Sequence, residues 1–145
     1  MERNLSLDLH VLTARLDRAA DRILRAEHDI SYSRFLALTL VGELGASTQR
    51  ALADGLGVTE PSVSRMTSVL AADGLLDVQP DPGGGNRRRL SLTDEGKRLV
   101  ATIRREFEDR LAAVVAESGV PYAEYAKHTA RLLETFDRLE REAGK

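Results

Sequence analysis

The stretch PDPGGGNRRRLSLT, residues 80–93, decides the fold of this chain. Two prolines and three glycines stand directly before three consecutive arginines, and the alternating Leu-Ser-Leu-Thr follows them. Glycine permits the sharp backbone reversal that the tip of a hairpin needs. The segments on either side, LLDVQ at 75–79 and RRLSL at 88–92, read as strands. We therefore predict one β-hairpin whose returning strand carries the arginines.

Two short helices are predicted directly before this hairpin. Ser47 or Thr48 is a suitable cap for the first helix, and Gly57 allows the tight turn that ends it. Thr59 caps the second helix, which stops at Gly74. Two short helices joined by a turn fit a helix-turn-helix, and a hairpin followed by a further helix completes the order of a winged helix.

The second of these helices, 59–73, is predicted to have one apolar and one polar face. On a helical wheel the apolar side chains gather on one side, and they are Val63, Met66, Val69 and Leu70. The opposite face carries Ser64, Arg65 and Ser68, with Thr67 on its flank. Short hydroxyl side chains allow close approach to the DNA major groove, and one arginine can bind guanine O6 and N7. A solvated surface helix has the same pattern, so the helix alone leaves both interpretations open.

Amphipathic helices are predicted on both sides of this region. The first 30 residues form one such helix, and a second, mostly apolar helix begins at Ser31 or Ser33. Thr93 caps a long helix, which Gly119 and Pro121 separate from the last one. The apolar stripe of the first helix is Leu5, Leu9, Leu12, Leu16, Ala20 and Ile23. That of the long helix is Leu99, Ile103, Phe107, Leu111, Val114 and Val115. That of the last helix is Tyr125, Thr129, Leu132, Phe136 and Leu139. The sequence therefore predicts a mainly α fold with one small β-hairpin.

The charge distribution points to one local basic patch. The chain has 145 residues, of which 42% are apolar and 30% charged, and this composition is typical of a folded protein of one domain. Its net charge of −2 does not by itself indicate a nucleic-acid partner. However, Arg87, Arg88 and Arg89 are adjacent, and no acid stands between Asp81 and Asp94. We expect this patch to bind phosphates or a minor groove.

Catalysis and cofactor binding are not expected. The chain has no cysteine, which excludes disulfides, thiolate catalysis and cysteine-ligated zinc. Three scattered histidines, His10, His28 and His128, do not have the spacing of a metal site. The glycines at 83–85 lead into arginines and a strand, whereas those of a phosphate-binding loop lead into a helix N-terminus. No histidine, carboxylate and nucleophile are spaced for catalysis, so we predict that the protein is not an enzyme.

A cytoplasmic location is expected. No apolar run approaches the length of about 18 residues that a membrane-spanning helix needs. The stretch MERNLSLDLH at 1–10 mixes acids into what would be the apolar core of a signal peptide.

Four segments give the chain a family resemblance. They are SVSR at 62–65, DGLL at 73–76, DP at 81–82 and LSLTDEG at 90–96. In order and spacing they resemble the MarR (multiple antibiotic resistance regulator) family of bacterial winged-helix transcription factors, over nearly the whole length. The hairpin is then the wing. The resemblance implies one domain over 1–145, with a winged helix-turn-helix DNA-binding lobe at 31–98 and dimerisation helices at 1–30 and 99–145.

The wing departs from the family pattern in two places. Wings of this family usually carry an aspartate and an arginine near the tip, where this chain has Gly84 and Asn86. The arginine often found shortly after the Gly-Leu pair is absent, because Leu76 is followed by Asp77 and valine. We therefore expect the basic contacts of the wing to begin one position later, at Arg87.

The resemblance implies a homodimer that binds double-stranded DNA at a pseudo-palindromic operator, as a repressor, with release by a small-molecule effector. The residues expected to contact DNA are Gln49, Ser62, Ser64, Arg65, Thr67, Ser68, Asn86, Arg87, Arg88 and Arg89. Family members commonly bind small aromatic or anionic effectors in a cleft between the dimerisation and DNA-binding lobes. The candidates for that cleft are His10, His28, Tyr32 and Arg34, which alternatively lie on the surface or make interhelical hydrogen bonds.

Two other functions fit the same pattern. A winged helix that grips an acidic protein partner through its arginines, without binding DNA, has the same sequence features. DNA-binding regulators of other winged-helix families have a similar order of elements. Binding of random duplex DNA at low salt separates the first alternative, and the topology of the terminal helices decides the second.

Overall fold

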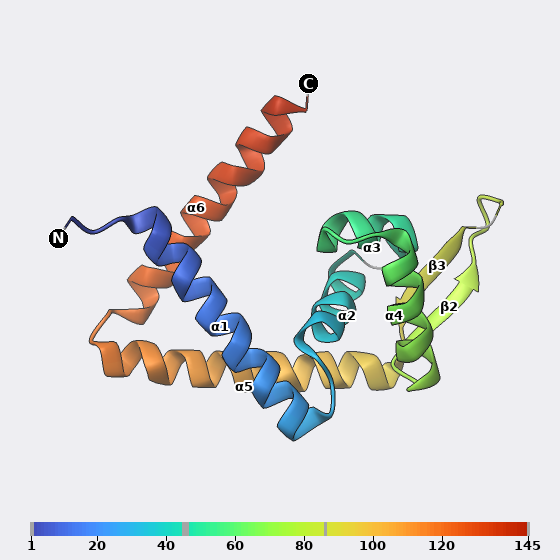
Figure 1. Ribbon diagram of the computed structural model, residues 1–145, viewed down its shortest axis with the longest axis horizontal. Coiled ribbons are helices and arrows are strands. Elements are labelled where there is room, and N and C mark those ends of the chain that lie inside the picture. The colour runs from blue at the N-terminus through green and yellow to red at the C-terminus, as the bar shows by residue number, and fades with distance from the viewer. Residues whose placement is uncertain (1, 45–46, 86, 145) are drawn as a thin grey trace. The chain divides into compact units, whose positions relative to one another are not determined.

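The computed structural model describes residues 2–44, 47–85 and 87–144 of the chain. They form two compact units, residues 1–103 and residues 104–145, and the boundary falls within a continuous helix. The elements, labelled in Figure 1, are α1 (Leu5–His28), α2 (Tyr32–Leu44), β1 (Ser47–Thr48), α3 (Gln49–Leu56), α4 (Glu60–Ala72), β2 (Leu76–Pro80), β3 (Arg88–Leu92), α5 (Asp94–Ser118) and α6 (Tyr122–Ala143). The predicted mainly α fold with a β-hairpin is confirmed.

The helix-turn-helix is fixed by the caps that the sequence predicts. Thr48 accepts a hydrogen bond on its Oγ1 from the N–H of Ala51, at 3.1 Å, and so caps α3. Gly57 ends that helix in the left-handed conformation, with φ of 68°. Thr59 then caps α4 by accepting from the N–H of Ser62 at 3.3 Å. Because each cap satisfies a backbone group that has no partner inside the helix, the turn between α3 and α4 is specified locally.

The sheet has three strands, in the order β1-β3-β2, where the sequence predicted two. In the hairpin, Leu76 lies opposite Leu92, and both neighbours of β3 run antiparallel to it. Arg89 therefore lies between Gln79 on one side and Thr48 on the other. The additional strand escaped prediction because two residues cannot show the alternation by which strands are recognised. It joins the start of α3 to β3 at Leu90 and Arg89.

The core of the first unit gathers side chains from α1, α2, α3, α4, the sheet and the first part of α5. Those that are almost fully buried are Leu24, Leu38, Val41, Leu52, Val63, Thr67, Leu70, Leu90 and Ile103. Burial of one leucine stabilises a fold by about 1.5–3 kcal/mol relative to leaving it exposed. The burial of Val63 and Leu70 confirms the predicted apolar face of α4, whose other face is left to solvent.

A compact junction ties the end of α4 to the start of α5. Thr93 donates from its Oγ1 to the carbonyl oxygen of Gly74 at 2.6 Å, and its N–H donates to the carbonyl of Leu75 at 3.2 Å. The same Oγ1 accepts from the N–H of Gly96 at 3.0 Å, which confirms Thr93 as the cap of α5. A Cβ atom at Gly96 would overlap the carbonyl oxygen of Leu75. Only glycine permits this approach, so the junction holds the hairpin and α4 in one arrangement.

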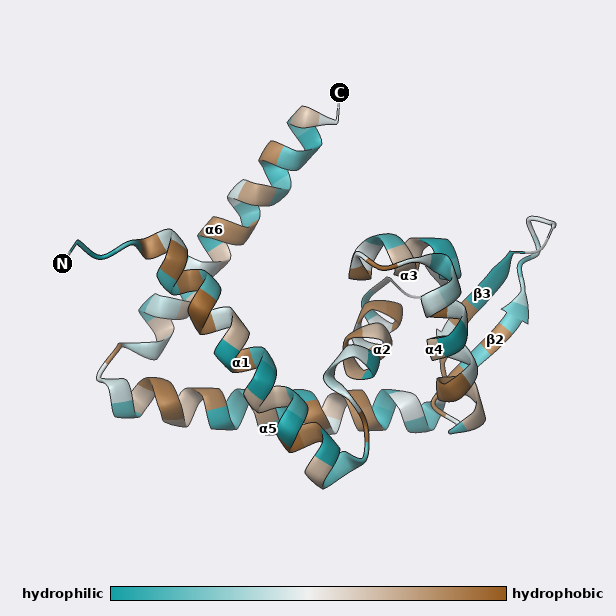
Figure 2. Cartoon of the chain, viewed as in Figure 1, coloured by the Kyte–Doolittle hydropathy of each residue, from teal (hydrophilic) through white to brown (hydrophobic). Residues whose placement is uncertain are grey.

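Two helices carry apolar side chains that the chain leaves exposed. On α1 these are Leu5, Leu7, Leu9, Val11, Leu12 and Leu16. On α6 they are Tyr122, Tyr125, Leu132, Leu133, Phe136 and Leu139, and no residue of this helix is buried. Figure 2 shows hydrophobic positions recurring along each of these helices. Among the described residues, no helix combines the length and the hydropathy needed to cross a membrane.

Candidate functional site

The outer face of α4 is polar and open to solvent. Ser64, Arg65 and Ser68 are exposed, as the sequence predicts. The guanidinium of Arg65 donates from Nη2 to the Oγ of Ser62 at 3.3 Å, and Ser68 donates its hydroxyl to the carbonyl of Ser64 at 2.9 Å. These bonds lie within the helix and fold the short side chains against it. The face can therefore approach another surface closely, with one cation at its centre.

Two of the residues expected to contact DNA lie between α3 and α4, away from the exposed face of α4. Thr67 is 1% exposed and Gln49 is half-buried. Gln49 donates from Nε2 to the Oγ1 of Thr67 at 3.2 Å, and Thr67 donates to the carbonyl of Ser64 at 3.1 Å. Thr67 follows Val63 by one helical turn, which places it on the buried stripe, and its two hydrogen bonds make the burial of a hydroxyl tolerable. The buried hydroxyl of Thr67 is not open to the expected direct contact, and its bond with Gln49 joins α3 to α4.

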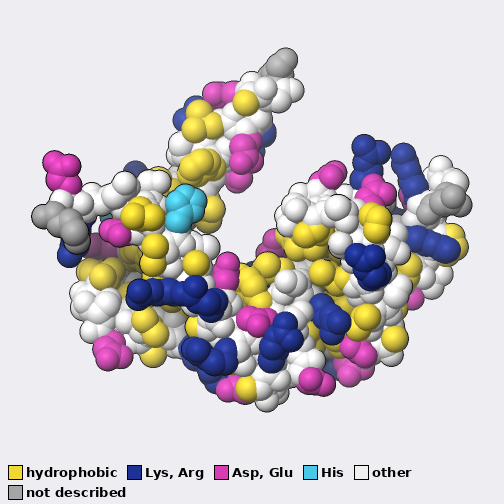
Figure 3. Space-filling model, in the orientation of Figure 1, with side chains coloured by type: hydrophobic (Ala, Val, Ile, Leu, Met, Phe, Trp, Pro, Cys, Tyr) yellow, Lys and Arg dark blue, Asp and Glu magenta, His cyan; other side chains and the backbone are white. Residues whose placement is uncertain are grey.

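The wing presents its arginines to solvent. Arg87, Arg88 and Arg89 are all exposed, and within 2–44, 47–85 and 87–144 none of their guanidiniums has an ion pair. Asp81 shapes the loop, because its Oδ1 accepts from the N–H of Gly83 at 3.3 Å and its own N–H donates to the carbonyl of Arg87 at 3.0 Å. Figure 3 shows basic side chains projecting beside the hairpin. Asn86, also expected to contact DNA, lies outside the described residues.

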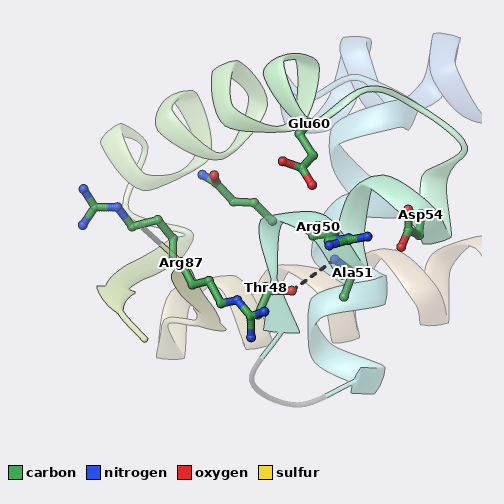
Figure 4. Close-up of a pocket in the computed structure, with 8 residues that line it drawn as sticks. Thr48, Arg50, Ala51, Asp54, Glu60 and Arg87 are labelled. Carbon is green, nitrogen blue, oxygen red and sulfur yellow. Dashed lines mark hydrogen bonds between the residues drawn. The ribbon is translucent and has the colours of Figure 1, made fainter. Parts of the chain in front are cut away.

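A groove of about 480 Å³ lies between the helix-turn-helix and the wing (Figure 4). It is lined by Thr48, Gln49, Arg50, Ala51, Asp54, Glu60, Arg87 and Arg88. Arg50, Asp54 and Glu60 are not among the residues predicted from the sequence. The positions of Arg50 and Glu60 at helix starts could have indicated them from the sequence. Arg50 follows the cap of α3 by two residues, and Glu60 is the first residue of α4. The first turns of both helices therefore bring charged side chains to one hollow, and the wing adds two arginines.

The four candidate effector residues are not gathered at this groove. His10 is exposed on α1, and His28, half-buried, is its last residue. Tyr32 is half-buried and its hydroxyl is hydrogen-bonded to Asp17; burial first, and then this carboxylate, raise the pKa of Tyr32. Arg34 is half-buried, and its N–H donates to Ser31 at 3.2 Å, which selects that serine as the cap of α2. Tyr32 therefore makes the interhelical hydrogen bond that was its alternative role.

The connection between α1 and α2 depends on one carboxylate. Asp21 accepts from the N–H of Tyr32 at 2.9 Å on one oxygen and pairs with the Nε of Arg25 at 2.8 Å on the other. The backbone hydrogen bond from Tyr32, and then the pairing with Arg25, lower the pKa of Asp21, against a smaller opposing effect of burial. The ionised form of Asp21 thus fixes where α2 begins.

Comparison with known proteins agrees with this architecture. Residues 28–85 match the model of the MarR family. The chain is 33% identical, over 115 residues, to an HTH-type transcriptional regulator of Mycobacterium bovis, with 79% of this chain and 80% of that protein covered. A homologous regulator of Mycobacterium leprae is 33% identical over 110 residues, or 76% of each chain.

Solved structures of low sequence identity share the fold. Wild-type MarR from E. coli in its apo form has a TM-score of 0.81 at 19% identity, covering 93% of this chain and 98% of that one. The MepR–DNA complex of S. aureus has a TM-score of 0.70 at 23% identity, covering 95% and 99%. With the relatives that exceed 30% identity over most of their length, these findings establish that the chain belongs to the MarR family of helix-turn-helix transcriptional regulators.

Proposed function

We propose that this protein regulates transcription by binding specific sequences of double-stranded DNA. The observation that carries the proposal is that an exposed hydroxyl-rich face on α4 lies beside wing arginines that have no ion pair among the described residues. The first is suited to base edges in a major groove, and the second to phosphates or a minor groove. The structurally similar MepR has been solved in complex with DNA, which supports the same partner here.

The proposed roles divide by element. Arg65, at the centre of the exposed face, reads a guanine, and Ser62, Ser64 and Ser68 fit the groove around it. The wing residues 86–89 contact the backbone or the minor groove. Gln49 and Thr67 hold α4 in position from behind.

A homodimer on a pseudo-palindromic operator is the proposed active form. A lone winged helix reads only a few base pairs, whereas two copies related by a twofold axis read two half-sites about 10–11 base pairs apart. The exposed apolar side chains of α1 and α6 are the surfaces available for self-association. In this proposal, 1–30 and 99–145 are the dimerisation helices and 31–98 the DNA-binding lobe.

Repression relieved by a small aromatic or anionic effector is the proposed mode of regulation, in the cytoplasm where the operator lies. Such relief requires an effector that binds one spacing of the two DNA-binding lobes more tightly than the other. His10, His28 and Arg34 remain the proposed effector contacts, and Tyr32 contributes only if its bond to Asp17 is exchanged.

Selection of bound duplexes from a random pool tests the proposal. The expected result is a twofold-symmetric motif, with affinity that falls as salt rises, at a slope of log K against log salt of about −5 to −7. Arg65→Ala should relax preference at one base pair per half-site, at a cost of roughly 1–3 kcal/mol, while Arg105→Ala should not. Absence of salt-sensitive DNA binding would instead favour a protein-interaction module.

A further inference from the structure

The groove between α3 and the wing contains three charged side chains that have no part in the proposed base and wing contacts, those of Arg50, Asp54 and Glu60. Arg50 comes from the first turn of α3, and Arg87 and Arg88 from the wing. Two carboxylates, those of Asp54 and Glu60, line the same hollow. Figure 4 shows Glu60 pointing from the start of α4 toward α3, on the side where Arg50 lies.

Among the described residues, no carboxylate neutralises the cations of this groove. No side chain of Arg50, Arg87 or Arg88 forms an ion pair or hydrogen bond with the residues that the structure describes. By contrast, Arg25 and Arg138 are each paired with a carboxylate one turn away on their own helix, at 2.8 and 3.3 Å. Asp54 and Glu60 are likewise unpaired among the described residues, although they share the hollow with three guanidiniums.

We propose that this groove seats the phosphates of one DNA strand, with Arg50 as a backbone anchor opposite the wing. The inference rests on the proposed DNA binding and extends it to a residue outside the recognition helix. An extended polyanion can bridge cations that come from two separate elements, whereas a single small anion reaches fewer of them. Phosphate contacts of this kind set the register of the protein on the duplex without reading sequence.

The two carboxylates give the groove a second property. A carboxylate beside a phosphate is repulsive, so Asp54 and Glu60 lower the affinity of the groove for any polyanion. The cost is the same on every sequence, whereas base contacts by α4 are made only at the operator. In our proposal the two carboxylates therefore keep the affinity for unrelated DNA low. At the operator, base contacts by α4 offset this loss of affinity.

The salt dependence of binding to a labelled random-sequence duplex, and to the selected operator, tests the anchor. Arg50→Ala should weaken both by a similar factor and make the slope of log K against log salt shallower by roughly 1 per subunit. Arg50→Lys keeps the charge and should keep the slope. Arg105→Ala removes an exposed arginine of α5 and is the matched control, with no change expected. Thermal unfolding of each variant checks that the fold is intact.

Neutral variants of the acids test the second property with the opposite sign. Asp54→Asn and Glu60→Gln should each tighten binding to the random duplex several-fold, and binding to the operator by a similar factor. An unchanged slope for Arg50→Ala, or loss confined to one base position, overturns the anchor. Unchanged random-duplex affinity in both acid variants overturns the role of the carboxylates. If the wild-type protein shows no salt-sensitive DNA binding, it is the proposed function that fails.

Discussion

The helices α4 and α6 are both amphipathic, but the apolar side of α4 is buried and that of α6 is exposed. The 13 residues of α4 bury Val63, Thr67 and Leu70 within their own unit and leave a polar face to solvent. The 22 residues of α6 bury nothing, although Leu133 and Phe136 are each 61% exposed. A helical stripe shows that a partner surface is needed, and it does not show whether the same chain supplies it. For α6, we propose that a second copy does.

The largest effect is expected from charges placed on the apolar side of α6. The double variant Leu132→Asp, Phe136→Asp should dissociate the proposed dimer, because two carboxylates would have to be buried at the interface. Loss of bivalency should weaken operator binding on the order of 1,000-fold. Sedimentation equilibrium measures the mass, and a fluorescence titration the affinity.

The matched control is Lys127→Asp, which adds a carboxylate on the side of α6 opposite Phe136. It should leave both mass and affinity unchanged. A dimer that persists in the double variant would show that α6 is not part of the interface. A second copy would then not be what covers its apolar side.

The second prediction contrasts a buried leucine with an exposed one. Leu70→Ala should lower the free energy of unfolding by about 2–5 kcal/mol, because it leaves a cavity in the core of the first unit. Leu133→Ala should act mainly through association, so that its loss of stability relative to the wild type disappears when the protein is diluted below the dissociation constant of the dimer. Urea unfolding at several protein concentrations measures both. Equal, concentration-independent losses would place the two leucines in the same kind of environment.

A third prediction concerns the junction that fixes the end of α4. Gly96→Ala should lower the free energy of unfolding by about 1–3 kcal/mol, because its methyl group collides with the Leu75 carbonyl. Gly55→Ala, inside α3, is the control: its Cβ would lie 3.4 Å from Leu40, and it should stabilise by up to about 1 kcal/mol. Chemical denaturation measures the free energy of unfolding of both variants and shows which one is stabilised and which destabilised. A neutral Gly96→Ala would mean that α4 is free to shift at its end.

The smallest effect is expected from pH and concerns the start of α2. Because the pKa of Asp21 is lowered by folding, its contribution is fully present above the ordinary value of 3.8 and is lost as pH falls through the lower folded value. Asp21→Asn keeps an acceptor for Tyr32 and should flatten the loss of stability in that acidic range. Glu142→Gln, which removes the exposed pair with Arg138 on α6, should not. Identical acid profiles for the two variants would contradict the role of Asp21.

Features encoded by neighbouring residues were predictable, and features set by packing were not. Thr48, Gly57 and Thr59 act within one helical turn, so the sequence alone locates the helix-turn-helix. Thr67 was placed on the flank of α4, because a wheel cannot show that Gln49, 18 positions away, would supply a hydrogen bond and allow its burial. The groove was missed for a similar reason, since its charges come from three elements that only the fold brings together.

The three wing arginines differ in how firmly their main chain is held. Arg89 is paired across β3 with strands on both sides, Arg88 lies opposite Pro80, which has no N–H to donate, and Arg87 precedes the strand. If Arg89 pairs with a phosphate, little further main-chain entropy is lost, because its backbone is already fixed by two strands. The entropy lost on pairing is larger for Arg88 and largest for Arg87. In the proposed complex with DNA, this gradient would let Arg87 adjust to minor grooves whose width varies with base composition, while Arg89 keeps its place.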